Sequence, residues 1–259
     1  MGGTHTHSPV ACSRDLVGCE KYLRANFSTF ARAICSVLLD SMTVERYSMY
    51  KLGSLICVNH GMGAPSLSIL MHEVFKLLSY AKATNVTILR VGTSGGLGVE
   101  PGTVIVSSGA LNSALEPVYT QHVLGRAVNH PTAADSDVAE TIVKSNSNAT
   151  SLNVISGLTM SCNDFYEEQA RLDGYFCDHT AQQRADFLRH CHQVGVRNIE
   201  MEAAAFLAFC YRAKIKAAVV CVALVDRLQG DQVTSTSEKL TLYSSNCITA
   251  VFNYIKQQQ

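Results

Sequence analysis

The run ILRVGTSGG at residues 88–96 constrains the fold of this chain more than any other stretch. The apolar and β-branched residues leading into it predict a buried strand that ends near Val91. The glycines that follow predict a turn whose backbone N–H groups can face an anion. Arg90 on a core strand needs an anionic partner, and Thr93 adds a hydroxyl beside it. The run therefore predicts a phosphate cradle, with a glycine-rich turn beside a structural salt bridge as the alternative. Its spacing matches neither the P-loop nor the dinucleotide-binding glycine pattern.

Length and composition favour a compact chain. Of its 259 residues, 47% are hydrophobic and 16% charged, which is typical of a globular protein with a large core. We expect residues 1–259 to form a single domain, with residues 1–29 irregular. The formal net charge is zero, which argues against a nucleic-acid partner.

The sequence gives no sign of a membrane segment, a leader peptide or a metal site. No apolar run approaches the roughly 20 residues of a membrane span, and the N-terminus lacks the pattern of a signal peptide. The ten cysteines include no CxxC pair, so we expect reduced thiols in a cytoplasmic protein. His190 and His192 have no third ligand nearby in sequence and are expected on a helix surface, without a metal.

Strand and helix patterns alternate along the chain, which is typical of the α/β class with a mostly parallel or mixed sheet covered on both sides. Strands are predicted at residues 46–51, 55–59, 86–91, 103–107, 153–159 and 217–225. Helices are predicted at residues 30–39, 67–78, 136–144, 180–194 and 203–211, and from about residue 238. The rest of the stretch 120–153 is polar and expected to be loop-rich.

Two further motifs carry candidate ligands for a nucleoside. Glu200-Met201-Glu202 places two carboxylates on one face of an extended segment, where they can hold sugar hydroxyls while the methionine packs on a ribose. The alternative is a pair of acids favoured by a helix N-terminus. Gln169 and Arg171 combine an amide that donates and accepts with a guanidinium fork, which suits the edge of uracil. The alternative there is a polar loop.

Taken together, these motifs resemble the animal-type uridine phosphorylases of the nucleoside phosphorylase-I family. The resemblance runs from about residue 45 to 233 and is carried by RYSMYK at 46–51, HGMGAPS at 60–66, RVGTSGG at 90–96, EPGT at 100–103, DFYEEQAR at 164–171, NIEME at 198–202 and DRLQGDQ at 226–232. It implies a central mixed β-sheet, partly barrel-like and flanked by helices, in a homodimer whose active sites are shared between subunits.

The resemblance also implies roles for three sets of residues. The phosphate set is Arg90, Thr93, Gly3 and Arg46, the last reaching in from the neighbouring subunit. The base set is Gln169, Arg171 and a stacking Phe165. The ribose set is Met201, Glu202 and Glu200. Arg90, Gln169 and Arg171 are expected to act in catalysis.

The N-terminus departs from the family pattern. Gly2-Gly3-Thr4 resembles the start of a first phosphate loop, but no strand precedes it and His7 stands where the family has an arginine. We therefore expect a truncated or spliced N-terminus, an unpaired edge on the neighbouring strand, and weak or absent phosphorylase activity in this form.

Three other departures affect the expected chemistry. Glu168 replaces a glycine before the base pair, and Asp226 replaces an asparagine. An acid near the latter position protonates the base in related purine enzymes, so a purine substrate stays open. Tyr47 stands where bacterial relatives place a potassium ligand, so no such ion is expected.

The favoured interpretation is phosphorolysis of uridine to uracil and ribose 1-phosphate, with phosphate as co-substrate and no cofactor. One alternative is a purine nucleoside phosphorylase or a nucleosidase that uses water. The other is an inactive paralogue or isoform that binds nucleoside or dimerises with an active subunit.

Overall fold

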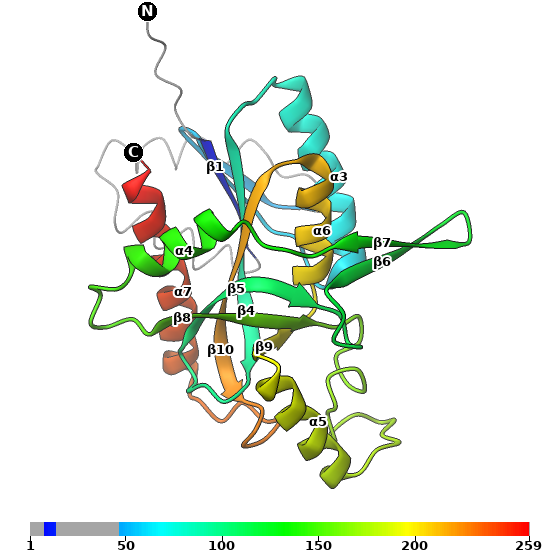
Figure 1. Ribbon diagram of the computed structural model, residues 1–259. Helices are drawn as coiled ribbons and strands as arrows, with labels where there is room; N and C mark the ends of the chain where they lie inside the picture. The colour runs from blue at the N-terminus through cyan, green and yellow to red at the C-terminus, as the bar shows by residue number, and fades with distance from the viewer. Residues whose placement is uncertain (1–7, 14–46, 259) are drawn as a thin grey trace, which may run out of the picture.

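The computed structural model describes residues 8–13 and 47–258. An eight-stranded mixed sheet forms its centre, in the order β10-β5-β8-β9-β4-β1-β3-β2. Its strands are β1 (Ser8–Ser13), β2 (Met49–Leu52), β3 (Leu55–Val58), β4 (Val86–Gly96), β5 (Val104–Leu111), β8 (Val154–Ser161), β9 (Val196–Glu200) and β10 (Lys216–Asp226). A separate hairpin, β6 (Val118–Val123) with β7 (Arg126–Pro131), projects from the body (Figure 1).

Part of the sheet closes into a barrel. Strand β10 pairs antiparallel with β5 and parallel with β4, so β10, β5, β8, β9 and β4 form a ring. The apolar run predicted at 217–225 forms most of β10, and its residues 217–223 are buried. This arrangement confirms the expected α/β class and the partly barrel-like mixed sheet.

Helices cover the sheet on both sides (Figure 1). On one side, α3 (Gly63–Tyr80) and α6 (Ala203–Ala213) share a core cluster that includes Ile88 of β4. On the other side, α4 (Ser136–Ser145) and α7 (Ser237–Gln257) pack on the opposite faces of β4 and β10. Helix α5 (Ala181–Gln193) covers β8 and β9 through a third cluster. These five helices confirm the predicted ones, apart from 30–39, which lies outside the described residues.

Two local predictions were wrong. Strand β4 does not end near Val91 but continues through the glycines to Gly96, because Gly95 and Gly96 pair with β9. Within the stretch expected to be loop-rich, β6 and β7 form a hairpin. Its turn places Leu124 and Gly125 at positive φ, as two-residue hairpin turns require. Leucine is an unusual residue for that conformation, so the turn left no clear sequence signal.

The expected unpaired edge at the N-terminus was also wrong. Strand β1 lies between β3 and β4 and runs parallel to both. In that register Cys12 is opposite Arg90. Gly3, which lies outside the described residues, comes before this strand in sequence and not after it. No helix within the described residues is long and apolar enough to cross a membrane.

Candidate active site

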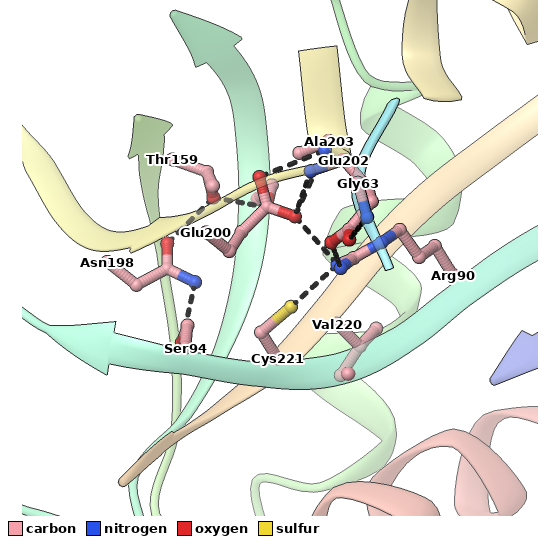
Figure 2. A network of polar contacts seen from close by, with 12 residues as sticks. Gly63, Arg90, Ser94, Thr159, Asn198, Glu200, Glu202, Ala203, Val220 and Cys221 are labelled. Carbon is pink, nitrogen blue, oxygen red and sulfur yellow. Dashed lines mark hydrogen bonds and ion pairs between the residues drawn. The ribbon is translucent and has the colours of Figure 1, made fainter. Parts of the chain in front are cut away.

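Arg90 lies at the centre of a buried polar cluster (Figure 2). Its Nη1 donates to Glu200 Oε2 at 2.9 Å and contacts Cys221 Sγ at 3.1 Å, while Nη2 pairs with Glu202. The guanidinium folds over Gly92, where an added Cβ would lie only 3.3 Å from both terminal nitrogens. A glycine is needed here because it leaves room for the guanidinium.

The two glutamates are fixed by backbone donors at the start of α6. Glu200 ends β9, and its carboxylate accepts the N–H groups of Glu202 and Ala203 at 2.9 Å. Glu202 accepts the N–H of Gly63 at 2.5 Å, which ties it to the start of α3. The contacts expected from a helix terminus for these acids, and from a salt bridge for Arg90, are therefore both present in this cluster.

The charges of Arg90 and Glu202 stabilise each other, whereas burial and the like charge of Glu202 raise the pKa of Glu200 despite the nearby Arg90. Burial alone would lower the pKa of Arg90, but Glu200, Cys221 and Glu202 raise it above its ordinary value. Burial raises the pKa of Glu202, yet Arg90, the Gly63 N–H and His60 bring it below its usual range. Burial raises the pKa of the Cys221 thiol to about 12, so this group is neutral beside Arg90.

Of the other residues of the phosphate and ribose sets, Thr93 and Met201 lie in the described part of the chain. Thr93 is half-buried, three residues beyond Arg90 on β4. Met201, between the two glutamates in sequence, lines a cavity of about 160 Å³ that Ser161 also lines. Arg46 and Gly3 lie outside the described residues, so their roles stay predictions.

The base set forms a second cluster on the loop that follows β8. Arg171 lies over the ring of Phe165, with 4.5 Å between Cζ and the ring centroid. Its Nε and Nη2 hold Asp173 at 2.8 and 2.6 Å. Between Gln169 and Arg171, Ala170 has a φ of +53°, an uncommon backbone conformation for a residue other than glycine. The loop is thus held in a specific shape that carries both expected base ligands.

Sequence reasoning missed the residues that hold this loop. Buried Arg227 donates from Nη2 to the backbone carbonyl of Gln169 at 2.7 Å, and its Nε pairs with Asp231 at 2.9 Å. Arg184 of α5 pairs with the same carboxylate at 2.6 Å. Gly95 lies against Arg227, where an added Cβ would stand 2.8 Å from its Cγ. The available signal was the DRLQGDQ motif, whose Arg227 and Asp231 are four residues apart.

Cys162, another residue that sequence reasoning passed over, joins the two clusters. Its backbone N–H donates to the Glu200 carbonyl at 2.8 Å. Its thiol donates to the carbonyl of Glu168 at 3.5 Å, directly before Gln169. The residues expected to bind phosphate and ribose and those expected to bind the base are therefore connected through Cys162, a buried residue directly after β8.

The two unusual acids hold backbone groups. Asp226 Oδ1 accepts the N–H groups of Gly98 and Leu228 at 2.9 and 3.0 Å. Glu168 accepts the N–H of Asn163 at 2.7 Å. Both carboxylates hold the backbone of loops in the candidate site. These contacts give the two acids a structural role that is independent of whether the substrate is a purine.

Comparison with known proteins identifies the family of this chain. Residues 40–255 match the model of the phosphorylase superfamily. A uridine and thymidine phosphorylase of Caenorhabditis elegans is 44% identical over 90% of this chain and 78% of its own length. An inactive uridine phosphorylase B of Schistosoma mansoni is 38% identical over 82% of this chain and 72% of its own.

Solved structures resemble the whole described fold. A crystal structure of uridine phosphorylase from Schistosoma mansoni in complex with thymine has a TM-score of 0.88 and 35% identity, covering 97% of this chain and 87% of that one. The chain belongs to the phosphorylase superfamily and, within it, to the uridine phosphorylases, a family of pentosyltransferases.

Proposed function

We propose that this chain catalyses the reversible reaction of uridine with phosphate to give uracil and ribose 1-phosphate. The observation that carries the proposal is the placement of the Gln169 and Arg171 loop beside the buried Arg90, Glu200 and Glu202 cluster, with Cys162 joining them. One cluster offers groups for an anion and a sugar, and the other offers groups for a pyrimidine edge.

At the phosphate end, Arg90 with Thr93 and Arg46 binds the anion and directs an oxygen to C1′ of the ribose. The new C–O bond forms as the C1′–N1 bond breaks, and the electron pair of that bond leaves with uracil. The ribose carries oxocarbenium character at the transition state, and Glu202 and Met201 hold it in place. Phosphate is a co-substrate here, and we propose no separate cofactor.

At the base end, Gln169 and Arg171 bind the carbonyl and imide edge of uracil. Two contacts orient the Arg171 guanidinium: Asp173 accepts hydrogen bonds from one edge of it, and the Phe165 ring packs against its face. Its positive charge stabilises the negative charge that develops on the departing base, the kind of preorganised electrostatic effect that usually dominates catalysis. Phe165 stacks on the pyrimidine ring.

We further propose a cytoplasmic homodimer with shared sites. Arg46 comes three residues before β2, the strand at the end of the sheet order, from which a side chain can reach a second subunit. Cys162, Cys177, Cys191, Cys221 and Cys247 are free thiols, which suits a reducing compartment.

A substrate panel tests the function. Uridine, thymidine and inosine are incubated with the protein, each with and without phosphate, and the free base is measured. We expect uracil from uridine only with phosphate present. Release of hypoxanthine from inosine, or of uracil without phosphate, would favour the purine or nucleosidase alternative. No product at high protein concentration would favour the inactive alternative.

A further inference from the structure

A chain of hydrogen bonds crosses all five strands of the barrel. Ser107 of β5 lies 2.5 Å from Thr159 Oγ1 of β8, which donates to Asn198 Oδ1 of β9 at 2.7 Å. Asn198 Nδ2 donates to Ser94 Oγ of β4 at 3.1 Å, and that hydroxyl donates to the Val222 carbonyl of β10 at 3.3 Å. We call Ser107, Thr159, Asn198 and Ser94 the polar belt; Figure 2 shows its Thr159–Asn198–Ser94 portion beside the Arg90 cluster.

The polar belt occupies buried positions at which apolar side chains would cost less free energy to bury. All four side chains are buried, and Thr159 and Asn198 are 0% exposed. Buried polar groups cost stability when any partner is missing, and a satisfied network gains little over an apolar core. What such a network supplies is a single geometry, because each donor has one matching acceptor.

The strand register of β9 is the feature that such a network would fix. Asn198 and Glu200 are two residues apart and share a face of β9, which is only five residues long. Its pairing with β4 is short: Gly95 lies opposite Ile199 and Gly96 opposite Asn198, and one further backbone bond runs from the Leu97 N–H to the Arg197 carbonyl. Its register against β8 shifts beside Thr159. A slip of one residue would turn Glu200 away from Arg90.

We propose that the polar belt is a positioning device that sets the register of β9 and thereby holds Glu200 against Arg90. Asn198 is its central positioning residue, since it lies on β9 itself and binds side chains on both strands beside it, Thr159 on β8 and Ser94 on β4. The inference rests on the proposed function only in assigning Arg90 to phosphate. The proposal adds residues that do not contact the substrate but determine the position of the Arg90 guanidinium.

Paired variants test this proposal. Asn198→Leu removes both side-chain links of β9. Thr159→Val keeps the side-chain shape but removes one of those links and also the link to Ser107. Thr159→Ser keeps the hydroxyl and serves as the conservative variant. Thr132→Val is the matched control, because that buried hydroxyl donates to the Ala110 carbonyl, outside the belt. Each is compared with wild type in uridine turnover against phosphate concentration, calorimetric binding of inorganic phosphate and of uracil, and melting temperature.

We expect Thr159→Val to lower kcat/KM for phosphate by about 10-fold and Asn198→Leu by about 100-fold, because small misplacements of binding groups have effects of this size. Uracil affinity should stay within about twofold of wild type, and Thr159→Ser should behave like wild type. If Asn198→Leu does not fold, Thr159→Val decides the matter alone. Equal losses in Thr132→Val and Thr159→Val, or parallel losses of phosphate and uracil affinity, would overturn the proposal.

The two proposals fail in different ways. Wild-type protein that binds phosphate but does not cleave uridine refutes the proposed function, and the belt is then judged from phosphate binding across the same variants. Wild-type protein that cleaves uridine while the belt variants keep full phosphate affinity refutes the belt alone.

Discussion

Replacing Gln169 by leucine is the most direct test of base recognition. The side chain is 4% exposed, so a leucine of similar volume fits the same space. The anchor of this residue is its backbone carbonyl, which accepts from Arg227 and is unchanged by the substitution. Among the described residues, the side-chain amide makes one hydrogen bond, a long contact of 3.4 Å to the Asp164 carbonyl. The loop should therefore keep its shape in the variant.

The expected loss follows from what the amide would contribute to the base. A glutamine can make two hydrogen bonds to the pyrimidine edge, each contributing about 0.5–1.5 kcal/mol net, and a base edge left unpaired in a buried site costs more. The sum is about 3 kcal/mol, which corresponds to a fall of at least about 100-fold in kcat/KM for uridine.

Steady-state kinetics with a thermal melt measures this prediction. Gln182→Leu is the matched control, since that glutamine is exposed on α5 and pairs only with Asp186. Both variants should melt near wild type, and only Gln169→Leu should lose turnover. Wild-type turnover of uridine in folded Gln169→Leu would remove this residue from the base site and refute the reasoning.

Three further predictions follow from the same contacts. Mixed Arg46→Ala and Arg90→Lys subunits, each inactive alone, should regain activity through heterodimers with one intact site; heterodimers without activity would exclude a shared site. Gly92→Ala should raise the phosphate KM several-fold with little change in melting temperature, because its Cβ would press on the Arg90 guanidinium; an unchanged KM would show that Arg90 tolerates the shift. Arg171 holds the pKa of Asp173 at about 2, below the usual 3.8, so the stability from this pair is present above pH 3.8 and lost only as pH falls toward 2. Uracil affinity should then be equal at pH 7 and pH 5 in calorimetry, and a marked fall at pH 5 would contradict this.

Local sequence patterns were enough to predict most elements. Thr180 caps α5 with a reciprocal contact from Gln183, and the helix begins where its pattern starts. The apolar run of β10 is buried on both faces and could form little else. The junction at Glu200 was also predictable, because an alternating segment there meets an alanine-rich helix.

Contacts between distant segments could not be predicted in this way. The local sequence predicts a turn at the glycines after Val91, yet these glycines belong to strand β4. Their missing side chains leave room for two arginines, Arg90 and Arg227. Nothing near Arg90 in sequence reveals that Cys221 and the two glutamates of the NIEME motif would surround it. Likewise, β1 is recognisable only through its partners β3 and β4.

One contact joins the residues expected to bind phosphate to those expected to bind ribose. The resemblance predicts Arg90 as a phosphate ligand and Glu202 as a ribose ligand, and the two side chains are paired with each other. A phosphate that takes the guanidinium competes with this carboxylate, while the Gly63 N–H continues to hold Glu202 in place. The oxygen released from Arg90 can then accept a ribose hydroxyl. Phosphate and nucleoside binding are therefore expected to be coupled, and because coupling free energies are reciprocal, each ligand should raise the affinity for the other by the same factor.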